Sequence, residues 1–513
     1  MRRRSWTLGS CFVLLCLAIA GPASAAVGPL RLASGPSPYA PGCTGAPDAG
    51  IVYPGSEVEP SIAANPVRPR NLIATWQQDR WDSGGANGVR TGVSVDGGAS
   101  WRLPQSPPFS RCAGGTEANG GNFERATDPW VSFAPNGDAY QISLSFNLTS
   151  PGNAILVSKS RDGGLNWGPI KTLIRDFQPG QDNDKETLTA DPTNARYAYA
   201  VWQRFNTPDP AEPNDYTGPT FFARTTDGGE TWEPARIIYD PGFRNQTLGN
   251  LIVVLPNGEL VCLFNRIIGG TSTVAVIRSR DKGDTWSEPI VVDKLGTALV
   301  LDPRDKSYVR TGDLIPQVAV DPRPGRANLY AVWQDARFNG NKADQIALSR
   351  STDGGLTWST PTRVSEVLST QAFTPAVHVN RRGVVGVSYY DFTADSATSI
   401  PLSTDRWLAR STDGGRSFGP RERLTRTSFD MREAPIARGP FLGDYSGLTS
   451  VGRGFVDFFA RANDGQPGNR SDVFSVRVGP PFAATGSDAP ASGRARTARA
   501  SRARRARGYI ARR

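Results

Sequence analysis

The stretch Ser94-Val-Asp96-Gly-Gly98-Ala-Ser100-Trp101 decides the fold, because its pattern returns five more times along the chain. The shared pattern is Ser/Thr-x-Asp-x-Gly-x-Ser/Thr/Asn-aromatic. The other copies are Ser160 to Trp167, Thr225 to Trp232, Ser279 to Trp286, Ser351 to Trp358 and Ser411 to Phe418. A supersecondary unit repeated at this spacing predicts an architecture built by stacking copies of one sheet.

The residue types of the repeat are typical of a tight hairpin turn. Aspartate and hydroxyl side chains hydrogen-bond turn amides, and glycine adopts a positive φ without a Cβ clash. The fifth copy lies between two strand-like runs, Ile346 to Arg350 and Pro361 to Ser365. We therefore predict that each copy closes a hairpin, that its aromatic packs between neighbouring sheets, and that its role is structural.

A second repeated block, a strand, a turn and another strand, precedes each of these turns. It is clearest in Ile315 to Pro322 followed by Leu329 to Asp335. Its counterparts begin at Glu59, Asp128, Glu186, Asn250 and Thr374, and a seventh copy spans Asp444 to Phe459. The seventh lacks the turn motif, so we predict that the strand-like Leu30 to Ala33 completes its sheet and removes two exposed edges.

These motifs resemble the Asp-box of the bacterial sialidase-like BNR-repeat β-propellers, and the resemblance covers most of the chain. It implies an all-β propeller of four-stranded blades closed by an N-terminal strand. Seven strand pairs favour seven blades, and six is the alternative because sialidases have six. The expected organisation is a signal peptide at 1–25, the propeller at 26–480 and a disordered Arg/Ala-rich tail at 481–513.

The two ends of the chain predict export and explain the net charge. Three arginines at 2–4, an apolar run and Ala23-Ser-Ala25 form a secretory signal cleaved near Ala25. Nine arginines lie in 494–513, so the body between signal and tail has a net charge of −2 although the whole chain has +10. We expect a secreted monomer with no specific nucleic-acid surface and no transmembrane segment, whose tail contacts anionic polymers or membranes by charge.

The cysteines and the single histidine limit the cofactor chemistry. Cys43 and Cys112 are candidates for a disulfide in an oxidising compartment, and Cys262 lies in an apolar run as a buried thiol. His378 alternates with apolar residues and is expected to pack within a strand, so a multi-histidine zinc site is excluded. No cofactor is predicted. Calcium held by carboxylates such as Asp182 and Asp184 stays open, although no recognised loop pattern occurs.

Aligning the strand pairs predicts two rings of residues at the mouth opposite the Asp-boxes. At the start of the first strands lie Glu59, Asp128, Lys185, Gly249, Ile315, Thr374 and Asp444, and Glu186 and Tyr445 each follow by one position. At the end of the second strands lie Gln78, Ser145, Arg204, Arg266, Asp335, Asp391 and Arg461, with Arg80 and Arg337 two positions further. Acids and arginines are thereby expected to converge on one axis.

The resemblance implies roles for these residues. In sialidases a tyrosine assisted by a glutamate is the nucleophile, an aspartate is the acid/base, and three arginines bind the sugar carboxylate. Catalytic candidates are Tyr445 or Tyr390, with Glu186 or Glu59 as base and Asp128 as acid/base. Candidates for substrate binding are Arg204, Arg266, Arg461, Arg80, Arg337, Asp335, Asp391 and Asp444.

Two functions remain open at this point. The first is a secreted sialidase-like exo-glycoside hydrolase that acts on terminal, anionic sugars of a glycan. The alternative is a non-catalytic propeller that binds carbohydrate or protein. The sialidase Arg-Ile-Pro signature is absent, since the equivalent strand begins Glu59-Pro60-Ser61, so the arginine assignments depend on register alone.

Overall fold

The computed structural model describes residues 27–47, 50–209, 211–396, 398 and 400–480. The expected signal sequence at 1–25 and tail at 481–513 lie outside the described residues. Ala25–Pro480 is one compact unit. Its regular elements in the described residues are antiparallel strands and two short 3₁₀ helices, η1 (Arg337–Asn339) and η2 (Met431–Glu433). The all-β prediction is confirmed for this part of the chain.

The first sheet has the strand order β2-β3-β4-β5-β6-β7-β8. Its strands are β2 (Val52–Ala64), β3 (Leu72–Trp81), β4 (Ala86–Ser94), β5 (Arg125–Phe133), β6 (Ala139–Phe146), β7 (Asn153–Ser160) and β8 (Lys171–Asp176). β4 and β5 share one register pair, Ala86 with Ala126, whereas β3 and β4 pair along most of their lengths. The sheet is therefore two antiparallel groups, β2 to β4 and β5 to β8, whose hydrogen-bonded ladders are joined by that single register pair.

Four further sheets follow in chain order, and their strands pair with sequence neighbours except that β25 pairs with β23. The next two consist of β9 (Gln181–Ala190), β10 (Ala198–Asn206), β11 (Thr220–Thr225) and β12 (Arg236–Tyr239), and of β13 (Gln246–Val254), β14 (Leu260–Ile268), β15 (Thr271–Ser279) and β16 (Ile290–Lys294). After them come β17 (Gln317–Val320), β18 (Leu329–Asp335), β19 (Gln345–Ser351) and β20 (Thr362–Arg363), and then β21 (Ala372–Val379), β22 (Val385–Asp391), β23 (Ser403–Ser411), β24 (Glu422–Arg423) and β25 (Phe429–Asp430).

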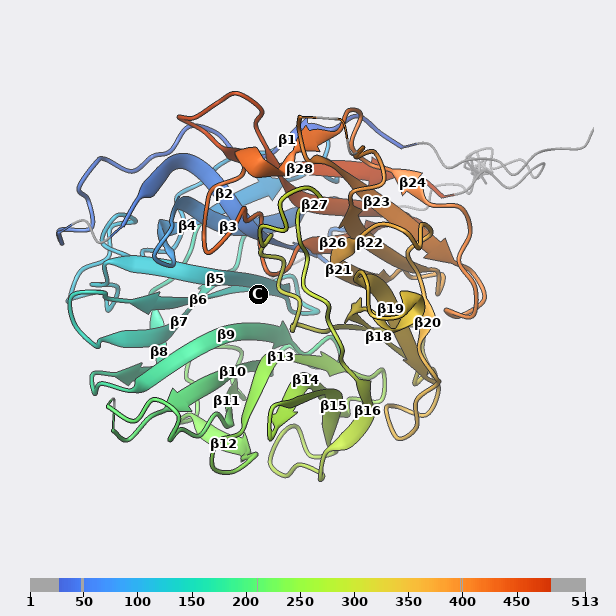
Figure 1. The fold of residues 1–513 in the computed structure, drawn as a ribbon. Coiled ribbons are helices and arrows are strands. Elements are labelled where there is room, and N and C mark those ends of the chain that lie inside the picture. Colours follow the sequence, from blue (N-terminus) through green and yellow to red (C-terminus); the bar gives the residue numbers. More distant parts are fainter. Residues whose placement is uncertain (1–26, 48–49, 210, 397, 399, 481–513) are drawn as a thin grey trace, which may run out of the picture. The chain divides into compact units, whose positions relative to one another are not determined.

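The last sheet joins the two ends of the described chain. It consists of β26 (Gly447–Val451), β27 (Gly454–Ala462), β28 (Ser471–Val478) and β1 (Arg31–Leu32). Arg31 pairs with Ser475 and Leu32 with Phe474, so the outer strand of this sheet comes from the N-terminal segment. The prediction that an N-terminal strand completes the unfinished sheet is confirmed (Figure 1).

The first strand of each antiparallel group faces the centre around which the sheets follow one another (Figure 1). These strands contact one another in a closed cycle, in which β26 returns to β2. The cycle is β2, β5, β9, β13, β17, β21 and β26. The ends of these inner strands thus meet, which is how residues far apart in sequence reach one site.

The Asp-boxes form the predicted hairpin turns. In the first, Asp96 Oδ1 accepts from the amides of Ala99 and Ser100 at 2.9 Å each, and Gly98 N donates to Ser94 Oγ at 2.8 Å. Gly97 and Gly98 have φ values of 77° and 86°, as the turn requires. The aromatic residue that ends each box packs between sheets. Trp101, for example, ends the first box, and its ring centroid lies 5.1 Å from that of Phe458 in a neighbouring sheet.

The cysteines and histidine also follow the sequence predictions. Cys43 and Cys112 form a disulfide, which ties the N-terminal segment to the insertion between β4 and β5. Cys262 is a buried free thiol within β14. His378 lies in β21, where its Nε2 is 3.0 Å from Ser450 Oγ. Among the described residues, no helix combines the length and the apolar character needed to cross a bilayer.

Candidate functional site

The inner strands have an unusual backbone at the predicted ring positions, which lie within the strands. Glu59, Asp128, Lys185 and Thr374 have φ values of 54°, 47°, 54° and 46°, and Gly249 at the equivalent position has 66°. The pairing register of each of these strands shifts at or next to this residue. A left-handed residue in a bulge redirects its side chain, and such strain in non-glycine residues is frequent at functional sites. The strand positions predicted to be equivalent from the sequence therefore share the same left-handed bulge in the structure.

Lys185 is the centre of the site. Its Nζ lies 2.8 Å from Asp128 Oδ1, 2.8 Å from Asp444 Oδ2 and 3.3 Å from Glu59 Oε1. The three carboxylates come from β5, from the segment before β26 and from β2; they are buried, and the Lys185 side chain is 11% exposed. One ammonium thus joins four strands of the cycle, and it satisfies carboxylates that would otherwise repel one another.

Two long segments outside the repeat add arginines to this cluster. Arg310, between β16 and β17, donates to both carboxylate oxygens of Asp444 at 3.1 and 2.6 Å. Its guanidinium also lies 4.3 Å from the ring centroid of Phe441, and residues 310 and 441 form a backbone bridge. Arg438, on the same segment as Phe441, is exposed and lines the same pocket. Two loops therefore bring cations to the mouth.

Arg80, near the end of β3, approaches the same aromatic ring as Arg310, with its guanidinium 5.1 Å from the centroid of Phe441. It is buried, and its Nη1 donates to Gln77 Oε1 at 2.9 Å and to the carbonyl of Gly85 at 3.1 Å. Burial lowers its pKa, whereas Glu59 acts in the opposite direction. Arg80 supplies a positive charge to the wall of the site.

The pKa values of the cluster differ widely because of burial and neighbouring charge. Burial, together with Asp128, raises the pKa of Glu59 to about 7. Burial acts in the same direction on Asp444, but Lys185 and Arg310 lower its pKa below the usual value. Burial alone would lower the pKa of Lys185, yet Asp128, Asp444 and Glu59 raise it well above its usual value. The ammonium is thus charged at neutral pH, and Glu59 titrates there.

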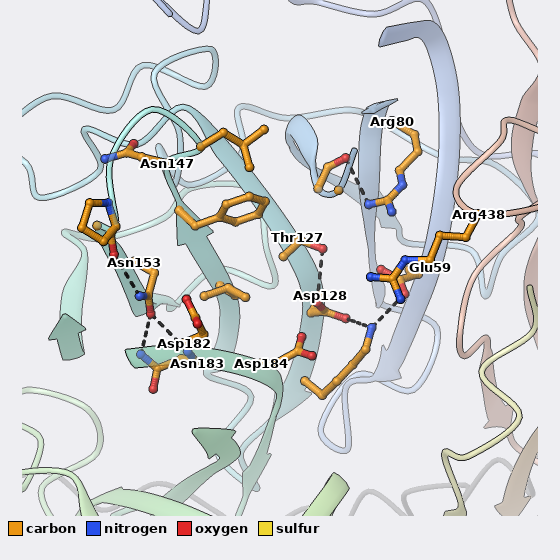
Figure 2. A pocket seen from close by; sticks show the side chains of 18 of the residues that line it. Glu59, Arg80, Thr127, Asp128, Asn147, Asn153, Asp182, Asn183, Asp184 and Arg438 are labelled. Carbon is orange, nitrogen blue, oxygen red and sulfur yellow. Dashed lines mark hydrogen bonds and ion pairs between the residues drawn. The ribbon is translucent and has the colours of Figure 1, made fainter. Parts of the chain in front are cut away.

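A pocket of about 330 Å³ opens above this cluster. It lies between β2, β5 and β9 and the loop that follows β6 (Figure 2). Its lining includes Glu59, Arg80, Thr127, Asp128, Asn147, Leu148, Asn153, Asp182, Asn183, Asp184, Lys185, Arg310 and Arg438. This combination of acids, arginines, amides and a few apolar side chains is suited to a polar ligand with an acidic group.

Asp184 is the acid of this pocket that titrates near neutral pH and is partly accessible. It lies on β9 next to Lys185, close enough to Asp128 for their charges to interact (Figure 2). Burial raises the pKa of Asp184 to about 6; Lys185 opposes the rise and Asp128 adds to it. A carboxyl whose pKa is raised towards neutrality, beside a second carboxyl group, is an arrangement suited to acid/base chemistry.

Tyr445 and Glu186 lie below the pocket rather than in its wall. With Lys185 and Trp130 they line a separate cavity of about 20 Å³. The Tyr445 hydroxyl lies 3.5 Å from the carbonyl of Pro129, and its ring contacts Trp130 edge to face at 5.4 Å. Glu186 accepts a hydrogen bond from the amide of Leu144, and its Oε2 has no partner among the described residues.

The electrostatic surroundings of these two side chains disfavour ionisation. Burial and the nearby Glu59 and Asp128 raise the pKa of Tyr445 well above its usual value. Burial and Asp128 likewise raise the pKa of Glu186. A phenol among four acids is a poor source of phenolate.

Tyr390 is placed elsewhere, which corrects the expectation that it reaches the mouth. It is 2% exposed, and its hydroxyl donates to the carbonyl of Ala460 at 2.6 Å. Its ring packs against Phe373 and Phe459. Tyr390 belongs to the apolar core between two sheets.

The arginines at the ends of the second strands are also held away from the pocket. Arg204 binds Asp176 with two hydrogen bonds of 2.9 and 2.6 Å. Arg266 donates to Tyr239 Oη at 2.7 Å, and Arg461 lies over the ring of Phe429 at 6.0 Å. None of them lines the pocket described above. Their partners lie at the end of β8, at the end of β12 and in β25.

The remaining candidates of the second ring are structural. Asp335 accepts from Trp333 Nε1 at 2.8 Å and binds Arg337, which also pairs with Asp293. Asp391 accepts from Trp407 Nε1 at 2.7 Å and binds Arg421. These pairs connect strand ends to the following loops.

The structure thus brings Glu59, Asp128, Asp444 and Arg80 together, with Glu186 and Tyr445 beneath them. Sequence reasoning missed Arg310 and Arg438 because the two segments that hold them have no counterpart in the repeat. It placed Lys185 in the ring without assigning it a role. Lys185 is the cation at a position where three other strands have acids, and that charge contrast was the available signal.

The charge of Lys185 also bears on metal binding. Among residues 27–47, 50–209, 211–396, 398 and 400–480, no group of three or more His, Cys, Asp or Glu side chains could hold a metal ion. Glu59, Asp128 and Asp444 share the ammonium of Lys185 instead. Calcium at Asp182 and Asp184 stays an untested prediction.

Comparison with known proteins gives distant similarities. No family model matches the chain. Xyloglucanase Xgh74A of Acetivibrio thermocellus is 25% identical over 237 residues, which cover 43% of this chain and 25% of the relative. A xyloglucanase of Paenibacillus sp is 26% identical over 258 residues, which cover 48% of this chain and 23% of the relative. The chain spans about a quarter of the length of these curated relatives.

Two solved structures illustrate the structural similarity. The Hadza microbial sialidase Hz136 has a TM-score of 0.45 at 16% identity over 79% of this chain and 73% of that one. The α-L-arabinofuranosidase Arb93A of Fusarium graminearum has a TM-score of 0.43 at 12% identity over 89% of this chain and 98% of that one. The Asp-boxes and the cycle of antiparallel sheets give this chain the sialidase-like β-propeller fold.

Proposed function

We propose that this chain is an exported glycoside hydrolase that removes a terminal, anionic sugar from a glycan. Its active site is the pocket above Lys185, and its propeller has seven blades. The observation on which the activity depends is the pairing of Asp184, whose pKa is raised to about 6, with the neighbouring Asp128, which accepts a hydrogen bond from Lys185.

The two carboxyl groups suit the two halves of glycoside hydrolysis. Asp184 donates its proton to the glycosidic oxygen as the bond from that oxygen to the anomeric carbon breaks. Water forms the new bond to this carbon, and the Asp128 carboxylate receives the proton that the water loses. The products are the free sugar and the shortened glycan. Lys185 holds the Asp128 carboxylate in place through an ion pair of 2.8 Å.

The positive side chains of the pocket support an acidic substrate. Arg438 is exposed at the pocket wall, and Arg80 and Arg310 lie behind it. Arg310 is already paired with both oxygens of Asp444, so Arg438 is the guanidinium that meets an incoming carboxylate first.

Tyr445 has no role as nucleophile in this proposal. Its hydroxyl lies in the small cavity below the pocket, and its pKa is raised well above the usual value by burial and by Glu59 and Asp128. A pair of carboxyl groups therefore replaces the tyrosine and glutamate that the sialidase resemblance implied.

Seven blades and export belong to the same proposal. Seven inner strands contact one another in a cycle, and a single register pair joins the ladders of β2 to β4 and β5 to β8, which supports counting them as two blades. The disulfide between Cys43 and Cys112 is the kind of bond that persists in oxidising compartments, in agreement with the signal-like sequence at 1–25.

The test is turnover of fluorogenic glycosides by the purified mature protein. The panel contains an α-sialoside, a β-glucuronide and an α-L-arabinofuranoside, with xyloglucan as a polymer. We expect hydrolysis of an anionic substrate, and a loss of about 10²- to 10⁴-fold in kcat for Asp184→Asn. Asp240→Asn, an exposed aspartate on a different loop, is the matched control and should keep full activity.

The second candidate is a non-catalytic glycan-binding propeller. The observation in its favour is that Asp128, Asp444 and Glu59 are all engaged by one lysine, which stabilises a rigid binding wall equally well. Saturable binding of a panel glycan, with no turnover and no effect of Asp184→Asn, would establish this function instead.

A further inference from the structure

The rim of the pocket has an exposed aromatic side chain that the proposed chemistry does not use. Phe177 is 60% exposed and lies on the segment between β8 and β9. Leu148, on the loop that follows β6, lines the pocket and is 40% exposed. Both segments are at the mouth, because Asn153 at the start of β7 pairs with Asp176 at the end of β8.

Phe177 is continuous with the pocket through Gly152. A Cβ added to Gly152 would lie 3.4 Å from Phe177 Cδ1 and 3.0 Å from Asn147 Nδ2, and both Gly152 and Asn147 line the pocket. The aromatic ring therefore stands next to the wall that Gly152 and Asn147 form. Asn147 lies on the side of the pocket opposite Glu59 (Figure 2).

The ring has a supported position. The guanidinium of Arg175 lies 6.0 Å from its centroid and 5.0 Å from that of Phe123, and Arg175 Nη2 donates to the carbonyl of Gly120 at 2.5 Å. A cation held between two rings restricts the motion of Phe177 and reduces the entropy cost of using it as a contact surface.

The polar side chains beside this rim complete a surface suited to a sugar. Asp182 is exposed and lines the pocket between the rim and Asp184. A pyranose has an apolar face of C–H groups and a perimeter of hydroxyls, so an aromatic ring beside a carboxylate matches both. Carboxylates accept hydrogen bonds from hydroxyls without needing a charged ligand.

We propose that Phe177, Leu148 and Asp182 form a second sugar subsite that binds the unit adjacent to the terminal sugar. The inference deepens the proposed function and shares its premise that the acidic pocket takes a glycan. It predicts that the site recognises at least two linked sugar units, one above Lys185 and one against Phe177.

Binding measurements test the subsite without requiring turnover. The Asp184→Asn protein is titrated calorimetrically with three pairs of probes: N-acetylneuraminic acid and 3′-sialylgalactose, galacturonic acid and digalacturonic acid, and arabinose and arabinobiose. We expect one two-unit probe to bind about tenfold more tightly than its monosaccharide. Phe177→Ala should abolish this gain and leave the affinity for the monosaccharide unchanged, whereas Phe177→Tyr should retain the gain.

Phe243 provides the matched control. It is 59% exposed and has the guanidinium of Arg244 5.1 Å from its centroid, but it lies between β12 and β13 and does not line the pocket. Phe243→Ala should bind every probe as the parent does. A gain that survives Phe177→Ala overturns the subsite, as does the absence of any gain or of any binding. A gain that depends on Phe177 in a protein without turnover would retain the subsite and refute the hydrolase.

Discussion

Lys185 and Asp444 are separated by 259 residues in sequence, yet Lys185 Nζ lies 2.8 Å from Asp444 Oδ2. Lys185 lies within the third inner strand of the cycle, β9, and Asp444 lies just before the last, β26. The pair therefore depends on closure of the whole cycle, and the same ammonium also binds Asp128 and Glu59.

Removing the Lys185 charge should destabilise the fold. Lys185→Met leaves three buried carboxylates without their shared cation, and breaking a buried ion pair on one side costs about 3 kcal/mol or more. We expect a loss of this size in the free energy of unfolding, measured by urea denaturation. Lys306→Met, at an exposed lysine, is the control and should change little. A loss below about 1 kcal/mol would contradict the role assigned to Lys185.

The pH dependence of turnover should report Asp184. Because its pKa is raised to about 6, it is protonated and able to act as a general acid below that pH, and it loses the proton as the pH rises. We therefore expect kcat to fall on the alkaline side with an apparent pKa near 6. Residual activity of Asp184→Asn should lack this limb. If the alkaline fall in kcat persists unchanged in Asp184→Asn, the titrating proton belongs to another group.

Arg438 should determine the preference for acidic substrates. Arg438→Ala removes the exposed guanidinium of the pocket, and the loss of one hydrogen bond to a charged group corresponds to roughly a tenfold rise in KM. The rise should be confined to anionic glycosides and should shrink at high salt. Arg426→Ala, at another exposed arginine, should leave KM unaltered. Equal effects on neutral and anionic substrates would exclude carboxylate recognition by Arg438.

The disulfide should stabilise the N-terminal segment. Cys43 and Cys112 are separated by 69 residues, and closing a loop of this size stabilises a native state by about 2 to 4 kcal/mol. The double variant Cys43→Ser, Cys112→Ser should show a loss in this range by chemical denaturation. A reducing agent should destabilise the parent protein and have no effect on the double variant. Parent and variant of equal stability would refute the prediction.

The Asp-boxes should contribute stability that disappears in acid. Hydrogen bonds from the Thr285 hydroxyl and amide lower the pKa of Asp281 to about 2, below the value of about 3.9 in an unfolded chain. Its contribution is present above pH 4 and is lost as the pH falls towards 2. Asp281→Asn should lower the Tm by about 2 °C at pH 7 and by much less at pH 2. A Tm difference that is independent of pH would show that the carboxylate charge is not involved.

The sequence by itself determined the repeat. Six Asp-boxes and seven strand pairs predict an all-β cycle, the closing role of Leu30 to Ala33, and the ring that contains Glu59, Asp128, Lys185 and Asp444. These predictions were possible because local turn chemistry and strand register repeat at equivalent positions, and equivalent positions in a cyclic stack face the same centre.

Only the tertiary structure decided which polar side chains share the site. Arg310 and Arg438 lie on segments without repeat equivalents, and their places depend on contacts such as that of residue 310 with residue 441. Register alone also grouped Arg204 and Arg266 with the site, although Asp176 and Tyr239 bind them elsewhere. A guanidinium lies several bonds from its backbone, so it binds whichever uncompensated acceptor is nearest. Which acceptor is nearest depends on three-dimensional packing.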